Sequence, residues 1–328
     1  MIRIRTLAVL MVVVALTLPA AAKDDALSLV PANAVTVGMV KLADMRTSPL
    51  SSFLFQHTDK MSTDGEAAKF LADAGLQPAK DVDTLVVATT PRSTLGSEAD
   101  VLVVAEGRFL PEKLTAALIS RGAVKKGAYI LFPEKDKDHS EHGAVAFLSP
   151  SLAIAGNERS VIAALEARAN GGTGFRSRGA LGLDLGRVDS KATAWALVDV
   201  TRAARLAKGG DINTGKGQSG EALQAAIKSL STVAVWATDT GDALELGAIG
   251  LSSDTETLEL LEDTIRGALS AMRLAVKDRQ PELVSVLRRF DINRKSDSIV
   301  VEGSIPAATL RDMMAKAAKK SHAAVGSK

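Results

Sequence analysis

The chain has 328 residues, of which 46% are hydrophobic and 3% aromatic, with 40 basic and 38 acidic side chains and no cysteine. Abundant apolar residues and a net charge near zero exclude a disordered chain. The lack of cysteine excludes disulfides, thiolate metal sites and a cysteine nucleophile, and the length allows one large domain or two ordinary ones.

Residues 1–22 have the form of a secretory signal peptide. Two arginines precede an apolar run of about 13 residues, and Ala20 and Ala22 stand at the −3 and −1 positions of a small-residue cleavage site. We predict cleavage between Ala22 and Lys23, and therefore a periplasmic or secreted protein. Cleavage removes two of the 40 basic residues, which leaves 38 against 38 acidic residues. An uncleaved segment, which would tether the protein to the membrane, is the alternative.

In chain order, the hydrophobic pattern of residues 27–170 predicts one α+β unit. Strands are expected at 34–42, 82–89, 100–106, 128–132 and 144–155, the last of them bent or turned at Ser149-Pro150. Helices are expected from Ser48, over 64–74, from Pro111 and over 159–169.

The order of elements repeats after the glycine-rich segment 170–174. Strands expected at 193–200, 232–238, 242–250 and 298–303 match those at 37–42, 83–89, 100–107 and 151–156. Gly220-Glu-Ala222 matches Gly65-Glu-Ala67 at a helix start. Five matches in one order predict an internal duplication. A long helix over 255–277, with a capping box at Ser253–Glu256, departs from the repeat, and a short helix from Pro281 follows it.

The predicted fold class is therefore α+β: two related units, each a mainly antiparallel sheet covered by helices. The expected division is a signal peptide at 1–22, a first unit at 23–170, a linker at 171–190, a second unit at 191–318 and a flexible tail at 319–328. Trp195 and Trp236 fall in matched strands of the second unit and are expected in the core.

The densest set of metal-capable side chains lies between two expected strands. It comprises Asp138, His139, Glu141 and His142. A His-x-x-His pair with flanking carboxylates is able to hold zinc or a similar cation. Interleaved lysines favour a charged hairpin loop instead, so these four residues are weak metal candidates.

Other patterns for chemistry are missing or incomplete. Gly210–Gly217 resembles a phosphate-binding loop, but it lacks the Ser or Thr that holds magnesium. There is no Gly-x-Ser-x-Gly, His-Glu-x-x-His or Ser-x-x-Lys motif. We therefore predict no catalytic residue and no cofactor. Basic and acidic residues alternate along the chain, so no nucleic-acid partner is expected.

Leu29–Ala34 before a strand, Ser48-Pro49-Leu50, Gly75–Pro78 and Asp81-Val-Asp83 resemble a pattern of uncharacterised exported bacterial proteins. The resemblance covers mainly residues 27–170, and its motifs are turn and cap signals. It implies a two-lobed α+β fold and an exported location, and it transfers no functional residue.

The leading functional prediction is an exported, non-enzymatic binding, scaffold or assembly protein. Its contact surface would be a groove between the halves or one open sheet face. The expected partner is an unidentified protein or small molecule of the cell envelope, without stable membrane insertion after cleavage. One alternative is a hydrolase with a non-standard or metal-assisted site near His139 and His142, and another is a membrane-tethered envelope protein.

Overall fold

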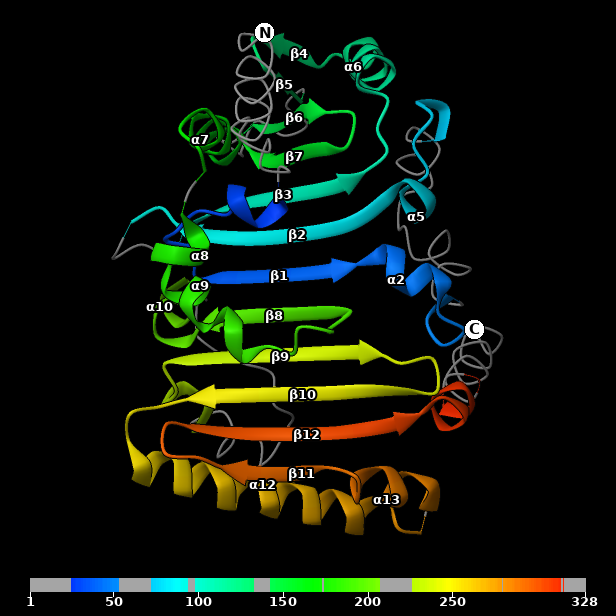
Figure 1. Ribbon diagram of the computed structural model, residues 1–328, viewed down its shortest axis with the longest axis vertical. Coiled ribbons are helices and arrows are strands. Elements are labelled where there is room, and N and C mark those ends of the chain that lie inside the picture. The colour runs from blue at the N-terminus through cyan, green and yellow to red at the C-terminus, as the bar shows by residue number, and fades with distance from the viewer. Residues whose placement is uncertain are drawn as a thin grey trace, which may run out of the picture.

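The structure, a computed structural model, describes residues 25–52, 72–93, 98–132, 142–172, 174–206, 226–278, 280–313 and 315. Its centre is one twelve-stranded sheet in the order β11-β12-β10-β9-β8-β1-β2-β3-β7-β6-β5-β4 (Figure 1). Neighbouring strands are antiparallel throughout. The predicted α+β class with antiparallel pairing is confirmed.

The first half of the chain supplies one side of this sheet. Its strands are β1 (Thr36–Lys41), β2 (Val82–Pro91), β3 (Ala99–Gly107), β4 (Val124–Lys126), β5 (Tyr129–Leu131), β6 (Gly143–Ser149) and β7 (Leu152–Asn157). Its helices are η1 (Ala26–Leu29), α2 (Leu42–Thr47), α5 (Pro78–Asp81), α6 (Pro111–Ser120) and α7 (Glu158–Ala169). Proline begins α5 and α6, at a position where its missing N–H costs no intrahelical bond.

The second half supplies the other side. Its strands are β8 (Ala194–Asp199), β9 (Thr232–Asp239), β10 (Ala243–Leu251), β11 (Asp291–Arg294) and β12 (Ser298–Pro306). Its helices are α8 (Phe175–Arg178), α9 (Ala180–Asp184), η2 (Leu185–Arg187), α10 (Val200–Leu206), α12 (Thr255–Val276) and α13 (Pro281–Leu287). Residues 307–313 are also helical.

The two halves meet at the pair β1 and β8, in the middle of the sheet. Gly38 pairs with Ala196 and Val37 with Leu197, so the strands of both halves form one sheet instead of two. The reason is that each half leaves one strand edge unpaired, and these two edges satisfy each other. Strands matched in the sequence lie at equal distances from this junction: β1 and β8, β2 and β9, β3 and β10, β7 and β12.

One face of the sheet, here named the covered face, holds the main core. Alternate residues of the central strands point to it, among them Val37, Val86, Leu102, Ile154 and Leu197. They pack under η1, α7, α8 and α9, and Figure 1 shows α8 and α9 at the left ends of the middle strands. Successive side chains of a strand point to opposite faces, so the remaining residues of these strands face the other side.

On the opposite face, here named the open face, the helices among the described residues lie towards its ends. The α6 residue Leu114 packs there with Val82 and Ala153. At the other end, α12 places Leu258, Leu261 and Leu269 against β11 and β12. These leucines recur at helical spacing, which gives α12 one apolar stripe. The middle strands between these two helical covers carry the groove described below.

Residues 171–190, expected as a linker, form α8, α9 and η2 and contribute to the core. Phe175 and Leu181 are each 1% exposed and belong to the main hydrophobic cluster. The segment therefore lies on the covered face as a structural layer.

Some local expectations differ from the structure. The N-cap of α12 is Asp254 rather than Ser253, because the Asp254 carboxylate accepts the Glu256 N–H at 3.1 Å. Strands β4 and β11 have no strong sequence pattern, since β4 is exposed throughout and β11 buries one residue. The helix expected over 64–74 falls mostly outside the described residues. Across the described segments, no helix is both long and apolar enough to span a bilayer.

Candidate functional site

The structure describes only one of the four weak metal candidates. Asp138, His139 and Glu141 lie outside the described residues, as do Ala22, Lys23 and the whole Gly210–Gly217 segment. In the part of the chain that is described, no three His, Asp or Glu side chains come close enough to hold a metal ion.

His142 stands at the start of β6, near a small polar cluster. Its carbonyl oxygen accepts the Glu158 N–H at 2.9 Å. The Tyr129 hydroxyl donates to Glu158 Oε1 at 2.7 Å, and Lys126 Nζ lies 3.5 Å from the same oxygen. The hydrogen bond from Tyr129 is the main cause that lowers the pKa of Glu158, and it raises the pKa of Tyr129 in turn. This carboxylate stays ionised and joins α7 to β5, which is a structural role.

An apolar groove of about 630 Å³ lies on the open face. Two rows of side chains form it, and each row crosses the strands in register. The first row is Val87, Gly38, Ala196, Val235, Ala248 and Val301, on β2, β1, β8, β9, β10 and β12. The second row is Leu85, Val40, Ala194, Ala237 and Leu246.

The groove is hollow because small residues occupy its floor. Gly38, Ala194, Ala196, Ala237 and Ala248 stand where strands usually carry β-branched or aromatic side chains. A Cβ added to Gly38 would lie 3.6 Å from the Trp195 carbonyl oxygen and 3.9 Å from Ala196 Cβ, so the space above it is free in this structure. Such a departure from strand propensity is typical of functional surfaces.

Larger apolar side chains form the raised parts of the groove. Val87 and Val235 are 39% and 45% exposed, although both are hydrophobic. Phe290, just before β11, covers Gly303, where a Cβ would come well within 3.0 Å of the ring. Among the described residues that line the groove, none carries a charge. This lining is suited to an apolar ligand and offers no acid, base or nucleophile for catalysis.

Trp195 and Trp236 contribute mainly backbone atoms to the floor of the groove. Trp195 and Trp236 pair directly across β8 and β9, and their side chains alternate to the covered face. Trp195 is 8% exposed and belongs to the core, while Trp236 packs against it half-buried.

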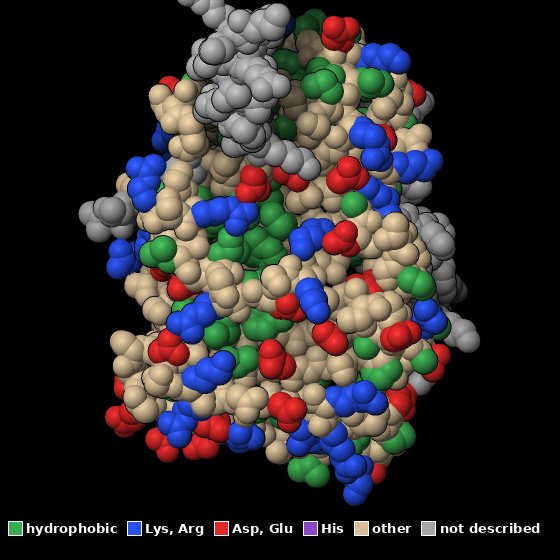
Figure 2. Space-filling view, viewed as in Figure 1, with side chains coloured by type: hydrophobic (Ala, Val, Ile, Leu, Met, Phe, Trp, Pro, Cys, Tyr) green, Lys and Arg blue, Asp and Glu red, His purple; other side chains and the backbone are tan. Residues whose placement is uncertain are grey.

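The covered face has a different character. Figure 2 shows this face, where acidic and basic side chains are interspersed around hydrophobic areas. A second hollow of about 310 Å³ lies on it, and its lining includes Asp189, Glu245, Arg289, Asp291 and Glu302. The two hollows therefore differ in their lining: the one on the covered face is polar, and the one on the open face is apolar.

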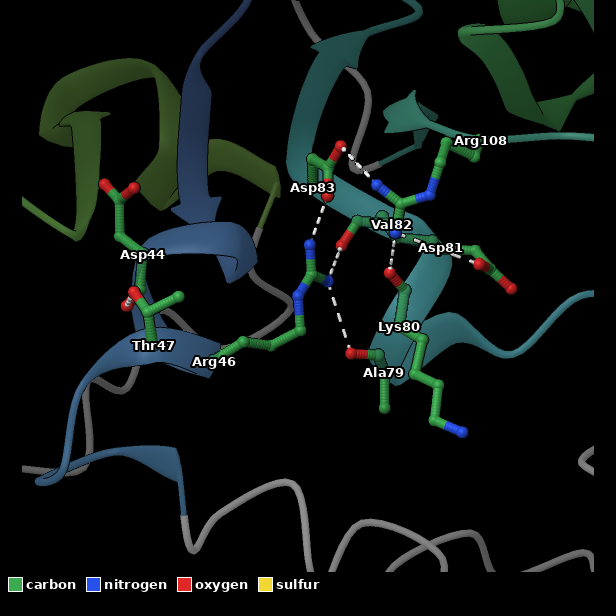
Figure 3. A network of polar contacts seen from close by, with 9 residues as sticks. All are labelled: Asp44, Arg46, Thr47, Ala79, Lys80, Asp81, Val82, Asp83 and Arg108. Carbon is green, nitrogen blue, oxygen red and sulfur yellow. Dashed lines mark hydrogen bonds and ion pairs between the residues drawn. The ribbon is translucent and has the colours of Figure 1, made fainter.

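A network of polar contacts fixes one strand end beside the groove (Figure 3). Arg46 of α2 pairs with Asp83 of β2, and its guanidinium donates to the carbonyl oxygens of Val82 at 2.6 Å and Ala79 at 3.2 Å. Arg108 approaches the same carboxylate at 3.5 Å from the other side. Asp83 is two residues from Leu85, so the network holds α2 and α5 against the strand that ends the groove.

The sequence predicts a contact surface in a groove between the halves or on one open sheet face, but it assigns no residue to that surface. The relevant sequence feature is a set of small residues that point to the same face of their strands: Gly38 in β1 and Ala194 and Ala196 in β8. These strands are apolar at nearly every position, and such runs are typical of strands buried on both faces. Only the sheet order shows that these small residues lie side by side.

No family model matches the chain, and no curated protein matches it either. Solved structures with a distant likeness include crystal forms I and III of TP0453. Form I is 12% identical with a TM-score of 0.46, covering 90% of this chain and 98% of that chain. Form III is 11% identical with a TM-score of 0.46, covering 89% and 98%. At this level the likeness assigns neither a family nor an activity.

Proposed function

We propose that this protein is an exported, non-enzymatic binding protein whose open sheet face takes up an apolar ligand. The observation that carries the proposal is the uncharged groove of about 630 Å³ across the middle strands. Small-molecule sites have volumes of about 300–1,000 Å³ and mostly apolar linings. Val87 and Val235 are exposed, so a ligand that covers them removes their apolar surface from water. This burial favours binding.

The remaining parts of the proposal come from the sequence. The N-terminal pattern supports export and a periplasmic or secreted location, and the intact mass of the purified protein tests cleavage after Ala22. The symmetric strand order about β1 and β8 supports an internal duplication. The groove includes the junction between the two units, because β1 and β2 of the first unit and β8, β9, β10 and β12 of the second contribute to its floor.

The binding test uses N-phenyl-1-naphthylamine, an uncharged probe whose fluorescence rises in apolar sites. We expect saturable binding to the purified protein. Gly38→Leu fills the floor of the groove and is expected to weaken binding about tenfold or more, because the probe loses the burial of several carbon groups. Replacing a strand glycine is not expected to reduce stability, since glycine disfavours strands.

The matched control is Gly186→Leu, the same change at an exposed position of η2 where an added Cβ meets nothing within 4 Å. This variant is expected to bind like the parent protein. Equal binding by Gly38→Leu and the parent, with both folded by circular dichroism, would remove the groove from the proposal.

A further inference from the structure

The groove has the proportions of a channel that runs across the strands. Its first row crosses six strands, which at about 4.8 Å per strand is a length of roughly 24 Å. Its width is two rows, or about 7 Å along the strands. A hollow more than three times longer than wide favours an extended ligand over a compact one.

The floor of the channel is uneven. Along the first row, the small residues Gly38 and Ala196 lie side by side, and Ala248 lies beyond them. Val235 stands between Ala196 and Ala248 with 45% of its surface exposed. A ligand with many rotatable bonds is able to adapt its shape to this uneven surface. A rigid ring system would leave gaps and lose van der Waals contacts.

The lining also selects by chemistry. In the described part of the groove, only Phe290 presents an aromatic ring, so planar aromatic ligands and sugars find little to stack against. The same lining contains no charged side chain and consists of aliphatic groups for most of its length. The matching ligand segment is therefore uncharged and aliphatic.

Building on the proposed function, we infer that the ligand is a single extended aliphatic chain that lies across strands β2 to β12. Its polar head group remains in solvent at the open rim. Each methylene in such a groove is covered from one side only, so it gains about half of the transfer free energy of a fully buried CH₂.

The test is competition of straight-chain primary alcohols of increasing length against bound N-phenyl-1-naphthylamine. Affinity is expected to rise about twofold per added CH₂ and to level off once the extended chain exceeds roughly 24 Å. A matched pair of competitors with equal carbon number, 1-dodecanol and cyclododecanol, separates extended from compact shape. The linear alcohol is expected to bind at least about fivefold more tightly than its ring counterpart, since the ring reaches fewer strands.

A shortened groove gives a second, independent readout. Ala248→Phe places a ring on β10 and leaves four strands, β2 to β9, or about 14 Å of the channel. The chain length at which affinity levels off is expected to fall accordingly, while short alcohols bind within about twofold of the parent. Gly186→Phe, outside the groove, is expected to leave the whole length series unchanged.

The outcomes distinguish this inference from the proposed function. Probe binding with equal competition by 1-dodecanol and cyclododecanol, or an unshifted length series in Ala248→Phe, would overturn the extended chain but keep an apolar site. Failure of the probe to bind at all would overturn both. Binding to phosphatidylcholine vesicles without competition by free alcohols would overturn the inference in favour of a bilayer surface.

Discussion

Trp236 of β9 and Gly247 of β10 are directly paired, and the indole occupies the space that a side chain on Gly247 would take. A Cβ at this position would come well within 3.0 Å of three indole atoms. The glycine is therefore required by the close approach of the tryptophan, and not by its own backbone conformation.

Gly247→Ala is accordingly expected to lower the free energy of unfolding by about 1–3 kcal/mol, because the indole must shift in a packed layer. Urea unfolding followed by tryptophan fluorescence measures the change. Gly186→Ala, at a position with free space, is the control and is expected to be neutral or stabilising. Equal stability of the two variants would show that the indole moves without cost.

Asp239 at the end of β9 gives a pH prediction. Burial acts to raise the pKa of this carboxyl, but hydrogen bonds from the Ser48 and Ser51 hydroxyls and the Gly241 N–H outweigh it and lower the pKa below its ordinary 3.8. A lowered folded-state pKa stabilises the protein above pH 3.8, and this contribution is lost as the pH falls towards the folded value. Asp239→Asn is expected to cost about 1 kcal/mol at neutral pH.

The loss in Asp239→Asn should shrink below pH 3.8, since this carboxyl then takes up a proton in the unfolded parent protein, and at lower pH in the folded protein as well. Urea unfolding at neutral pH and near pH 3 measures both values. A constant difference at the two pH values would contradict the assignment of the lowered pKa to Asp239.

The Arg46–Asp83 pair supplies a prediction about coupling. Arg46 is 20% exposed and also binds two carbonyl oxygens, so Arg46→Met is expected to cost about 1–2 kcal/mol. Asp83→Asn is expected to cost less, and a double-mutant cycle should give a coupling of about 0.5–1 kcal/mol. Arg108→Met serves as the comparison, because this side chain is 64% exposed, and it is expected to change stability by less than about 0.5 kcal/mol.

The N-cap of α12 gives a prediction that separates the roles of Ser253 and Asp254. Asp254→Ala removes the acceptor of the Glu256 N–H and the Thr257 hydroxyl, and it is expected to cost about 1 kcal/mol. Ser253→Ala is expected to leave the melting temperature unchanged, because Ser253 is not the cap residue. A larger loss from Ser253→Ala than from Asp254→Ala in thermal unfolding would contradict this assignment.

The strands and the long helix could be predicted from the sequence because their local patterns are strong. Val86 and Ala88 are buried while Val87 is exposed, which is the alternation of a half-covered strand. The stripe of Leu258, Leu261 and Leu269 likewise repeats at helical spacing. In both cases neighbours in the sequence determine the structure.

The groove and the joining of the two halves could not be predicted in this way. Gly38 and Ala196 are 158 positions apart in number, and only the pairing of β1 with β8 makes them neighbours. In the same way, the short α8 and α9 gain their stability from buried Phe175 and Leu181, not from helix propensity. Tertiary contacts decide these features, and the small residues of β1 and β8 do not by themselves show that the two strands are neighbours.

The central junction also constrains how the polypeptide reaches its native state. β1 pairs with β2 early in the chain, but its other edge is completed only when β8 has been made, more than 150 residues later. Until then a nascent first half presents a strand with unpaired N–H and C=O groups, which is a template for self-association. Closing such a distant contact is slow compared with hairpin formation. The β1–β8 pairing that makes the floor of the groove continuous is thus also the folding step that requires both halves of the chain.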